Sequence, residues 1–113
     1  MTRQQIIDWA LFVPELVAHE KLILLILALY ANLRRRELET SVSEISNLAK
    51  LSKRQTQRIL KSLAVKERIT AFRRRNPDGS NLPNVYKLVI KSEDLRASKK
   101  QRMFDDEEMR RLA

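Results

Sequence analysis

The feature that most constrains the fold is a pair of helix-start signals eleven residues apart. Ser41 and Glu44 form the pattern S-x-x-E, and Ser52 and Gln55 form the related pattern S-x-x-Q. In both patterns, the two side chains can bond backbone N–H groups that a helix start leaves without a partner. Apolar residues at helical spacing follow each signal. The sequence therefore predicts two short helices joined by a tight turn, the second covering about residues 53–63.

An apolar helix is predicted before this pair. Apolar residues fill most of 17–33 at helical spacing, which is typical of a helix buried on most of its faces. The run is shorter than the roughly 20 residues that span a bilayer. Residues 6–13 are also apolar and end at Pro14, so they can form either a short helix or an extended arm packed on the core.

A β-hairpin is predicted after the pair. Residues 68–75 and 84–91 have the pattern of two strands, and Asn76-Pro77-Asp78-Gly79 between them supplies turn residues. Ile69 and Phe72 are expected to give apolar cover from the first strand.

This order of elements predicts a fold that is mainly α with a small β-hairpin. We expect three parts: an N-terminal apolar arm or short helix (1–16), the main domain (17–91) and a charged C-terminal helix or tail (92–113). The tail carries a basic block at 96–102 and an acidic block at 105–108. It can be a dimerisation helix, a solvated helix or a frayed end.

The positive charge is concentrated in one segment. The chain has a formal net charge of +9, and residues 34–75 hold 13 Lys and Arg against 4 Asp and Glu. The remaining residues hold equal numbers of both signs. A positive field confined to one segment suits a partner with many phosphates, because neutralising phosphates releases bound counterions.

The composition argues against several kinds of chemistry. The chain has no cysteine and a single histidine, His19, which exclude disulfides, thiolate metal sites and multi-histidine metal sites. We expect no enzyme activity, because no nucleophile stands beside a base. No metal, cofactor, membrane partner or small-molecule ligand is indicated. A reducing cytoplasm, with association to a nucleoid or plasmid, is the expected location.

The second short helix is predicted to have two chemically different faces. At about 100° per residue, one face is apolar and the other basic. The apolar face holds Thr56, Ile59, Leu60 and Leu63, and the basic face holds Arg54, Gln57, Arg58 and Lys61. A solvated surface helix could show the same pattern. The absence of any acidic residue from Ser52 to Lys66 favours a binding surface instead.

From about 19 to 90 the chain resembles the winged helix-turn-helix DNA-binding family, and it is most similar to such domains in plasmid and phage replication proteins and bacterial repressors. The residues that carry the resemblance are Ser41-Val42-Ser43-Glu44-Ile45, Leu48, Leu51-Ser52-Lys53-Arg54, Leu60, Leu63, Ile69 and Pro83-Asn84-Val85-Tyr86. Glycine is common in the family where this chain has Lys50 and Glu67. A left-handed backbone costs such residues about 1 kcal/mol, so we expect these two turns to be made differently.

The resemblance implies a DNA interface in which the second short helix enters the major groove. Arg54 and Arg58 are the candidates for guanine, and Gln55 and Gln57 for adenine. Phosphate contacts are expected from Lys53 and Lys61 and from the helix start at Ser52. The wing residues Arg73, Arg74, Arg75 and Asn76 are expected to lie along phosphates or in the adjacent minor groove.

The expected partners are double-stranded DNA and a second copy of the chain. A transcriptional regulator is the preferred role, with replication initiation or partition as one alternative and a protein-interaction module as another. A symmetric dimer is predicted because one recognition helix reads few base pairs. The dimer interface can be formed by residues 6–13 or by the tail, and the tail is preferred because its two charged blocks can pair between subunits.

Overall fold

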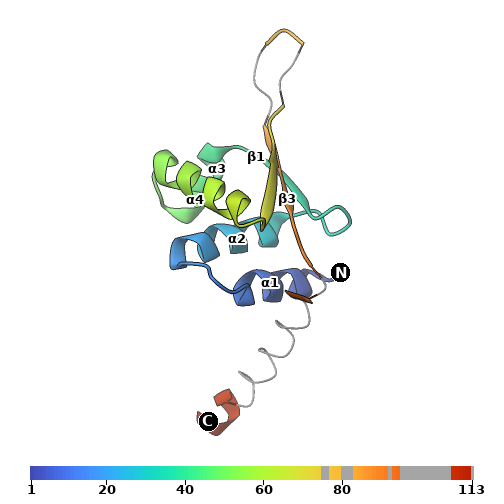
Figure 1. Cartoon of the computed structure of the whole chain (residues 1–113), viewed down its shortest axis with the longest axis vertical. Coiled ribbons are helices and arrows are strands. Elements are labelled where there is room, and N and C mark those ends of the chain that lie inside the picture. The colour runs from blue at the N-terminus through green and yellow to red at the C-terminus, as the bar shows by residue number, and fades with distance from the viewer. Residues whose placement is uncertain (75–76, 80–82, 92, 95–107, 113) are drawn as a thin grey trace.

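The computed structural model describes residues 1–74, 77–79, 83–91, 93–94 and 108–112. Its elements are α1 (Arg3–Phe12), α2 (Ala18–Tyr30), β1 (Glu37–Thr40), α3 (Val42–Ala49), α4 (Lys53–Val65), β2 (Ile69–Phe72) and β3 (Asn84–Leu88). The strands form one antiparallel sheet in the order β1-β3-β2, and residues 77–79, between β2 and β3, lie far from the helices (Figure 1). The predicted class, mainly α with a small β component, is confirmed.

Helix α2 is the centre of the core and contacts α1, α3 and α4. Residues 6–13 belong to this core, because α1 is a helix whose buried face packs on α2. The Arg3 guanidinium donates hydrogen bonds to the carbonyl oxygens of Ala28 and Ala31, at 2.9 and 2.6 Å. These carbonyls end α2 and lack partners within their own helix. The start of α1 therefore caps the end of α2, and the two helices run antiparallel.

Because Ile6, Trp9, Ala10 and Val13 are buried inside one subunit, they are not free to form a dimer interface. The N-terminal alternative for the dimer interface stays a prediction, and it depends on the less buried side chains of this segment, Ile7, Leu11 and Phe12.

Strand β1 was not predicted from the sequence. It has only four residues, two of them glutamates, and it lies at the sheet edge, where one side has no strand partner. Its register pairs Leu38 with Tyr86 and Glu39 with Val85. A short, charged edge strand of this kind carries little apolar alternation, which is why its sequence resembles a loop.

The prediction that Phe72 covers the core is wrong. Side chains alternate between the faces of a strand, so residues three apart point to opposite faces. Ile69 faces the core and is 2% exposed, whereas Phe72 lies on the outer face and is 49% exposed. Tyr86 and Leu88 of β3 share the inner face with Ile69 and are buried.

The expectation of altered turns at Lys50 and Glu67 is also wrong. Both residues have φ 59°, so both adopt the left-handed conformation that glycine usually supplies. After α3, the Leu51 N–H donates to the Ser46 carbonyl, and after α4, the Arg68 N–H donates to the Leu63 carbonyl. These bonds close the helix ends in the manner of a Schellman motif, and they offset the cost of a side chain at positive φ.

One buried acid joins α2 to the end of α4. Glu20 is 3% exposed. Its carboxylate accepts hydrogen bonds from Ser62 Oγ and Lys66 Nζ, both at 2.7 Å, and from the Val17 backbone N–H at 3.1 Å. Burial alone would raise the pKa of Glu20, but the bonds from Lys66, Ser62 and Val17 and the charge of Lys66 lower it below the ordinary value of 4.5. The ionised form is therefore stabilised by folding.

We expect Glu20→Gln to reduce the free energy of unfolding at pH 7 by about 1 to 3 kcal/mol, because a charged acceptor is removed. A lowered folded-state pKa contributes stability above the unfolded value, and this stability is lost as the pH falls through the folded value. The difference between variant and wild type should therefore shrink below pH 4.5. Urea unfolding at several pH values measures it, and a difference independent of pH would contradict the role of the carboxylate.

Candidate nucleic-acid interface

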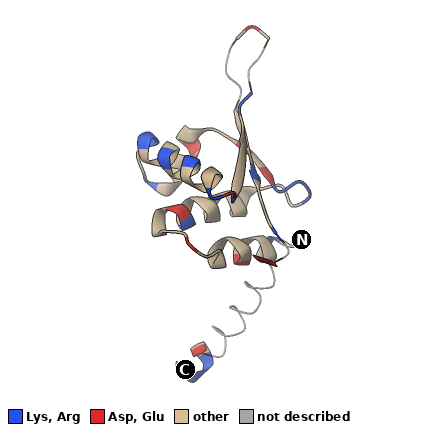
Figure 2. Cartoon of the chain, in the orientation of Figure 1, with Lys and Arg blue, Asp and Glu red and all other residues tan. Residues whose placement is uncertain are grey.

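Helix α4 presents one face of cations and amides to solvent. Its buried face consists of Thr56, Leu60 and Leu63, with Ile59 partly buried, as the sequence predicted. The residues on the outward side are all exposed: Lys53, Arg54, Gln55, Gln57, Arg58 and Lys61. Within the part of the chain that the structure describes, the four cations among them form no ion pair. They are therefore available to an external anion (Figure 2).

The start of α4 is fixed by its capping box. Ser52 Oγ accepts from the Gln55 N–H at 3.1 Å, and Gln55 Oε1 accepts from the Ser52 N–H at 3.2 Å. Both halves of the predicted box are therefore present. A bidentate contact to adenine needs both the oxygen and the nitrogen of an amide. Because the oxygen of Gln55 is already bonded, Gln57 is the better placed of the two glutamines.

The box before α3 is only half formed. Ser41 Oγ accepts from the Glu44 N–H at 3.1 Å, as predicted. The Glu44 carboxylate instead accepts from the Thr40 hydroxyl at 2.6 Å. Since Thr40 ends β1, this bond ties the edge strand to the first helix of the pair.

Just after β2, the two described arginines of the predicted wing, Arg73 and Arg74, have different surroundings. Arg73 is exposed. The Arg74 guanidinium lies 2.7 Å from the Glu39 carboxylate of β1 and also donates to the Pro83 carbonyl at 3.3 Å. No sequence pattern indicated this pair, because β1 itself was not predicted. Arg75 and Asn76 lie outside the described residues. Gly79, in the predicted turn, has φ 89°, which suits glycine.

A groove of about 510 Å³ lies between the exposed face of α4 and the β2–β3 hairpin and is lined by residues of both. Gln57 and Lys61 of α4 line it on one side, and Arg73 and Asn84 line it on the other. Apolar side chains, Leu60 and Tyr86 among them, form its floor. Asn84 was not predicted as a site residue. The sequence feature that could have indicated this role is a polar side chain at the start of the returning strand.

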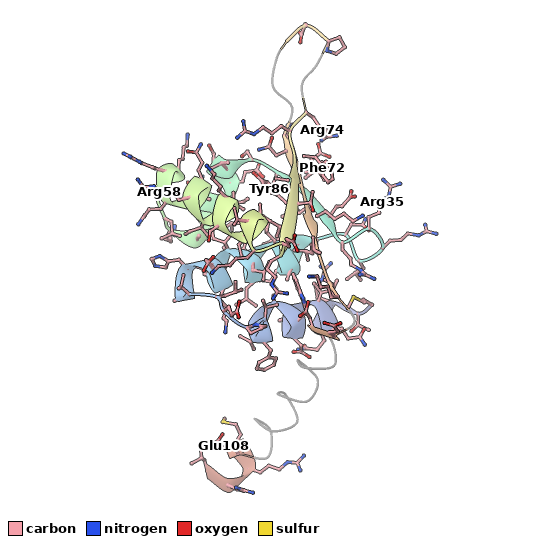
Figure 3. All side chains as sticks on the ribbon, viewed as in Figure 1. Arg35, Arg58, Phe72, Arg74, Tyr86 and Glu108 are labelled. Carbon is pink, nitrogen blue, oxygen red and sulfur yellow. The ribbon has the colours of Figure 1, made fainter. Side chains whose placement is uncertain are left out.

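The basic segment does not form one continuous surface. Arg34 and Arg35 lie in the loop between α2 and β1, on the other side of the molecule from α4 (Figure 2). Figure 3 shows Arg35 and Arg58 pointing in opposite directions. The cations of α4 and those of this loop therefore belong to two separate surfaces.

Metal sites and membrane spans find no support in the described residues. No group of three or more potential metal ligands occurs among them. Nor do they include a helix with the length and apolar character needed to traverse a lipid bilayer.

Comparison with known proteins identifies a similar fold. No protein-family model matches the chain, and no curated protein matches it. The structure is similar to that of a possible transcriptional regulator from Methanosarcina mazei Go1, with a TM-score of 0.51 and 19% sequence identity. The alignment covers 99% of this chain and 87% of that one. At this identity the likeness concerns the fold alone, which is mostly helical with a small three-stranded antiparallel sheet.

Proposed function

We propose that this protein is a transcriptional regulator of a bacterial, plasmid or phage system that binds a specific sequence in double-stranded DNA. The observation that carries the proposal is the outward face of α4, where four exposed cations have no ion-pair partner among the described residues. A solvated helix usually mixes charges of both signs. A helix with this face fits the major groove, and the groove beside it places the wing next to the same duplex.

Each residue has a proposed role on the duplex. Arg54 and Arg58 read guanine, because a guanidinium can bond two acceptors on the edge of that base. Gln57 reads adenine in the same bidentate way. Lys53 and Lys61 hold phosphates beside the helix. The protein acts by binding rather than by catalysis, and it works in the cytoplasm at the nucleoid or a plasmid.

A DNase footprint, in which the bound protein protects its site on the parent genome from cleavage, tests this proposal. One protected site beside a promoter supports the regulator, whereas repeated protected boxes at an origin favour replication initiation or partition on the same fold. No protection at any site at low salt would refute DNA binding and leave the protein-interaction module. The salt concentration must be stated, because phosphate contacts weaken steeply as salt is added.

The wing arginines should differ in their effect on DNA binding. Arg73→Ala is expected to lower affinity for specific and random duplexes alike, and to flatten the slope of log K against log salt by up to about 0.9 for each phosphate that is no longer neutralised. Arg74→Ala should change this slope less, because its guanidinium is engaged by Glu39. Titrations at several salt concentrations measure both slopes. If Arg73→Ala left the slope unchanged, the wing would not touch the DNA backbone.

We propose that the protein binds DNA as a symmetric dimer held by the C-terminal tail. A single helix distinguishes too few base pairs to select one site in a genome, and a dimer doubles the site. Most of the tail lies outside the described residues, but its helical residues 108–112 expose Met109 and Leu112. Opposite-charge blocks at 96–102 and 105–108 can pair between two copies.

Truncation after Asp94 tests the dimer and keeps the ion pair between Arg68 and Asp94, at 3.1 Å. Light scattering should give the truncated chain the mass of one chain and the parent the mass of two, and band-shift titration should show much weaker binding to the specific site. A dimeric truncated chain would move the interface to the described domain. A monomeric full-length protein would contradict the dimer itself.

A further inference from the structure

The outer face of the sheet forms an open hollow of about 880 Å³ that the duplex interface does not use. The opposite face of the sheet carries Ile69, Tyr86 and Leu88, which are buried against the core. The hollow therefore lies on the side of the sheet away from α4. Its lining contains one aromatic side chain, Phe72, which is 49% exposed.

Cations line the same hollow as this aromatic ring. Arg34, Arg35, Arg36 and Lys87 line the hollow against one acid, Glu37. Arg34, Arg35 and Lys87 have no ion-pair partner within the described ranges. The other acid of β1, Glu39, is engaged by Arg74 at 2.7 Å. The hollow is therefore strongly positive.

The arginine loop is held in a fixed shape. Asn32 Oδ1 accepts from the backbone N–H groups of Arg34 and Arg35, at 2.9 and 3.1 Å. The loop is joined to the sheet by the bond from the Leu88 N–H to the Arg36 carbonyl at 2.9 Å. Because Phe72 pairs with Val85, three residues from Leu88, the ring and the loop are separated along β3 by about 10 Å. One short oligonucleotide can reach both.

We infer that this face binds single-stranded nucleic acid, with a base stacked on Phe72 and phosphates held by Arg34, Arg35 and Lys87. An exposed aromatic ring on a sheet, next to cations that follow a backbone, is the chemistry by which proteins bind single strands without reading sequence. An acidic peptide would use the cations but not the aromatic ring. The inference goes beyond the proposed duplex binding and does not depend on it.

Fluorescence anisotropy with the full chain and a labelled oligothymidylate of about 10 nucleotides tests the inference. Phe72→Ala should lower the affinity about 5- to 150-fold, the usual effect of removing one stacked base. Phe72→Tyr should keep most of the binding, because the ring is retained. Arg34→Ala with Arg35→Ala should flatten the salt dependence by about 0.7 for each phosphate that is no longer neutralised.

A second measurement detects stacking directly. In Phe72→Trp the new indole lies in the hollow, whereas the natural Trp9 is buried in the core. Oligothymidylate should quench the new fluorescence. An absence of quenching when anisotropy shows saturation would overturn the assignment.

The matched control is the double variant Arg54→Ala, Arg58→Ala on α4, which should bind oligothymidylate as the wild type does. If this control lost single-strand binding while Phe72→Ala kept it, the single strand would bind α4 and the inference would be wrong. Displacement of the oligonucleotide by polyglutamate at equal charge concentration would also overturn it, by assigning the face to acidic peptides. Loss of duplex binding alone in the control would leave the inference intact, so the two proposals fail separately.

Discussion

Replacing Arg58 by alanine is expected to weaken binding to the specific duplex by about 1 to 3 kcal/mol and to relax the preference for one base pair. Arg58 lies on the exposed face of α4, has no ion-pair partner in the described parts of the chain, and points away from the core (Figure 3). Its replacement should therefore weaken the hold on DNA without disturbing the fold. The change in preference is measured by competition titrations with a series of duplexes in which one base pair of the site is replaced at a time.

Lys91→Ala is the matched control, because it removes the same charge at a side chain 52% exposed, paired only at 3.9 Å with the exposed Glu67. It should leave both affinity and preference nearly unchanged, since exposed pairs contribute little to stability. An equal weakening on specific and random duplexes after Arg58→Ala would assign this arginine to phosphate and contradict base reading.

Replacing Trp9 by alanine is expected to reduce the free energy of unfolding by about 3 to 5 kcal/mol. Trp9 is fully buried between α1 and the rest of the core. Its truncation leaves a cavity that neighbouring side chains fill only in part. An effect of this size is comparable to the whole stability of many small domains.

Trp9→Phe should cost no more than about 1 kcal/mol. The indole Nε1–H is buried, and it has no hydrogen-bond partner among the described residues. Phenylalanine removes that unpaired donor while keeping most of the apolar volume, so the two effects partly cancel. Urea unfolding followed by circular dichroism compares all three proteins, because the variants lack the tryptophan signal. Similar destabilisation in both variants would show that the indole ring as a whole is required.

The helical part of the fold was predictable because its signals are local. The capping boxes at Ser41 and Ser52 placed the starts of α3 and α4, and apolar spacing placed the buried face of α4. The predicted helix at 17–33 corresponds to α2, which begins at Ala18 and ends at Tyr30. These features depend on neighbours three or four residues apart, which a sequence displays directly.

The features that were missed depend on residues far apart in the chain. Strand β1 is defined by its pairing with β3, and the ion pair of Arg74 follows from that pairing. Glu20 is buried because Ser62 and Lys66, on another helix, reach its carboxylate. No local pattern marks such partners.

The candidate site was predictable in composition but not in layout. The outward residues of α4 follow from helical periodicity, and the structure places them together. The concentration of charge over 34–75 predicted a positive field confined to one segment of the chain, but the fold divides these cations between two sides of the sheet. The sequence gives the number of cations in a segment. The side of the molecule on which each cation lies depends on how the chain folds.

The pairing of β1 with β3 sets an order for folding during synthesis. Helices α1 to α4 are complete once the chain has emerged to Val65, and their contacts with one another are available at that point. Strand β1 is synthesised before α3, but its partner β3 ends only at Leu88. Glu37 can therefore pair with Lys87 only after about 50 further residues have been synthesised. Pairings between distant segments form slowly, because a long loop must close first. A nascent chain can therefore hold its helices together while the groove beside α4 and the outer face of the sheet are still missing, and the proposed single-strand site is complete only when β3 is in place.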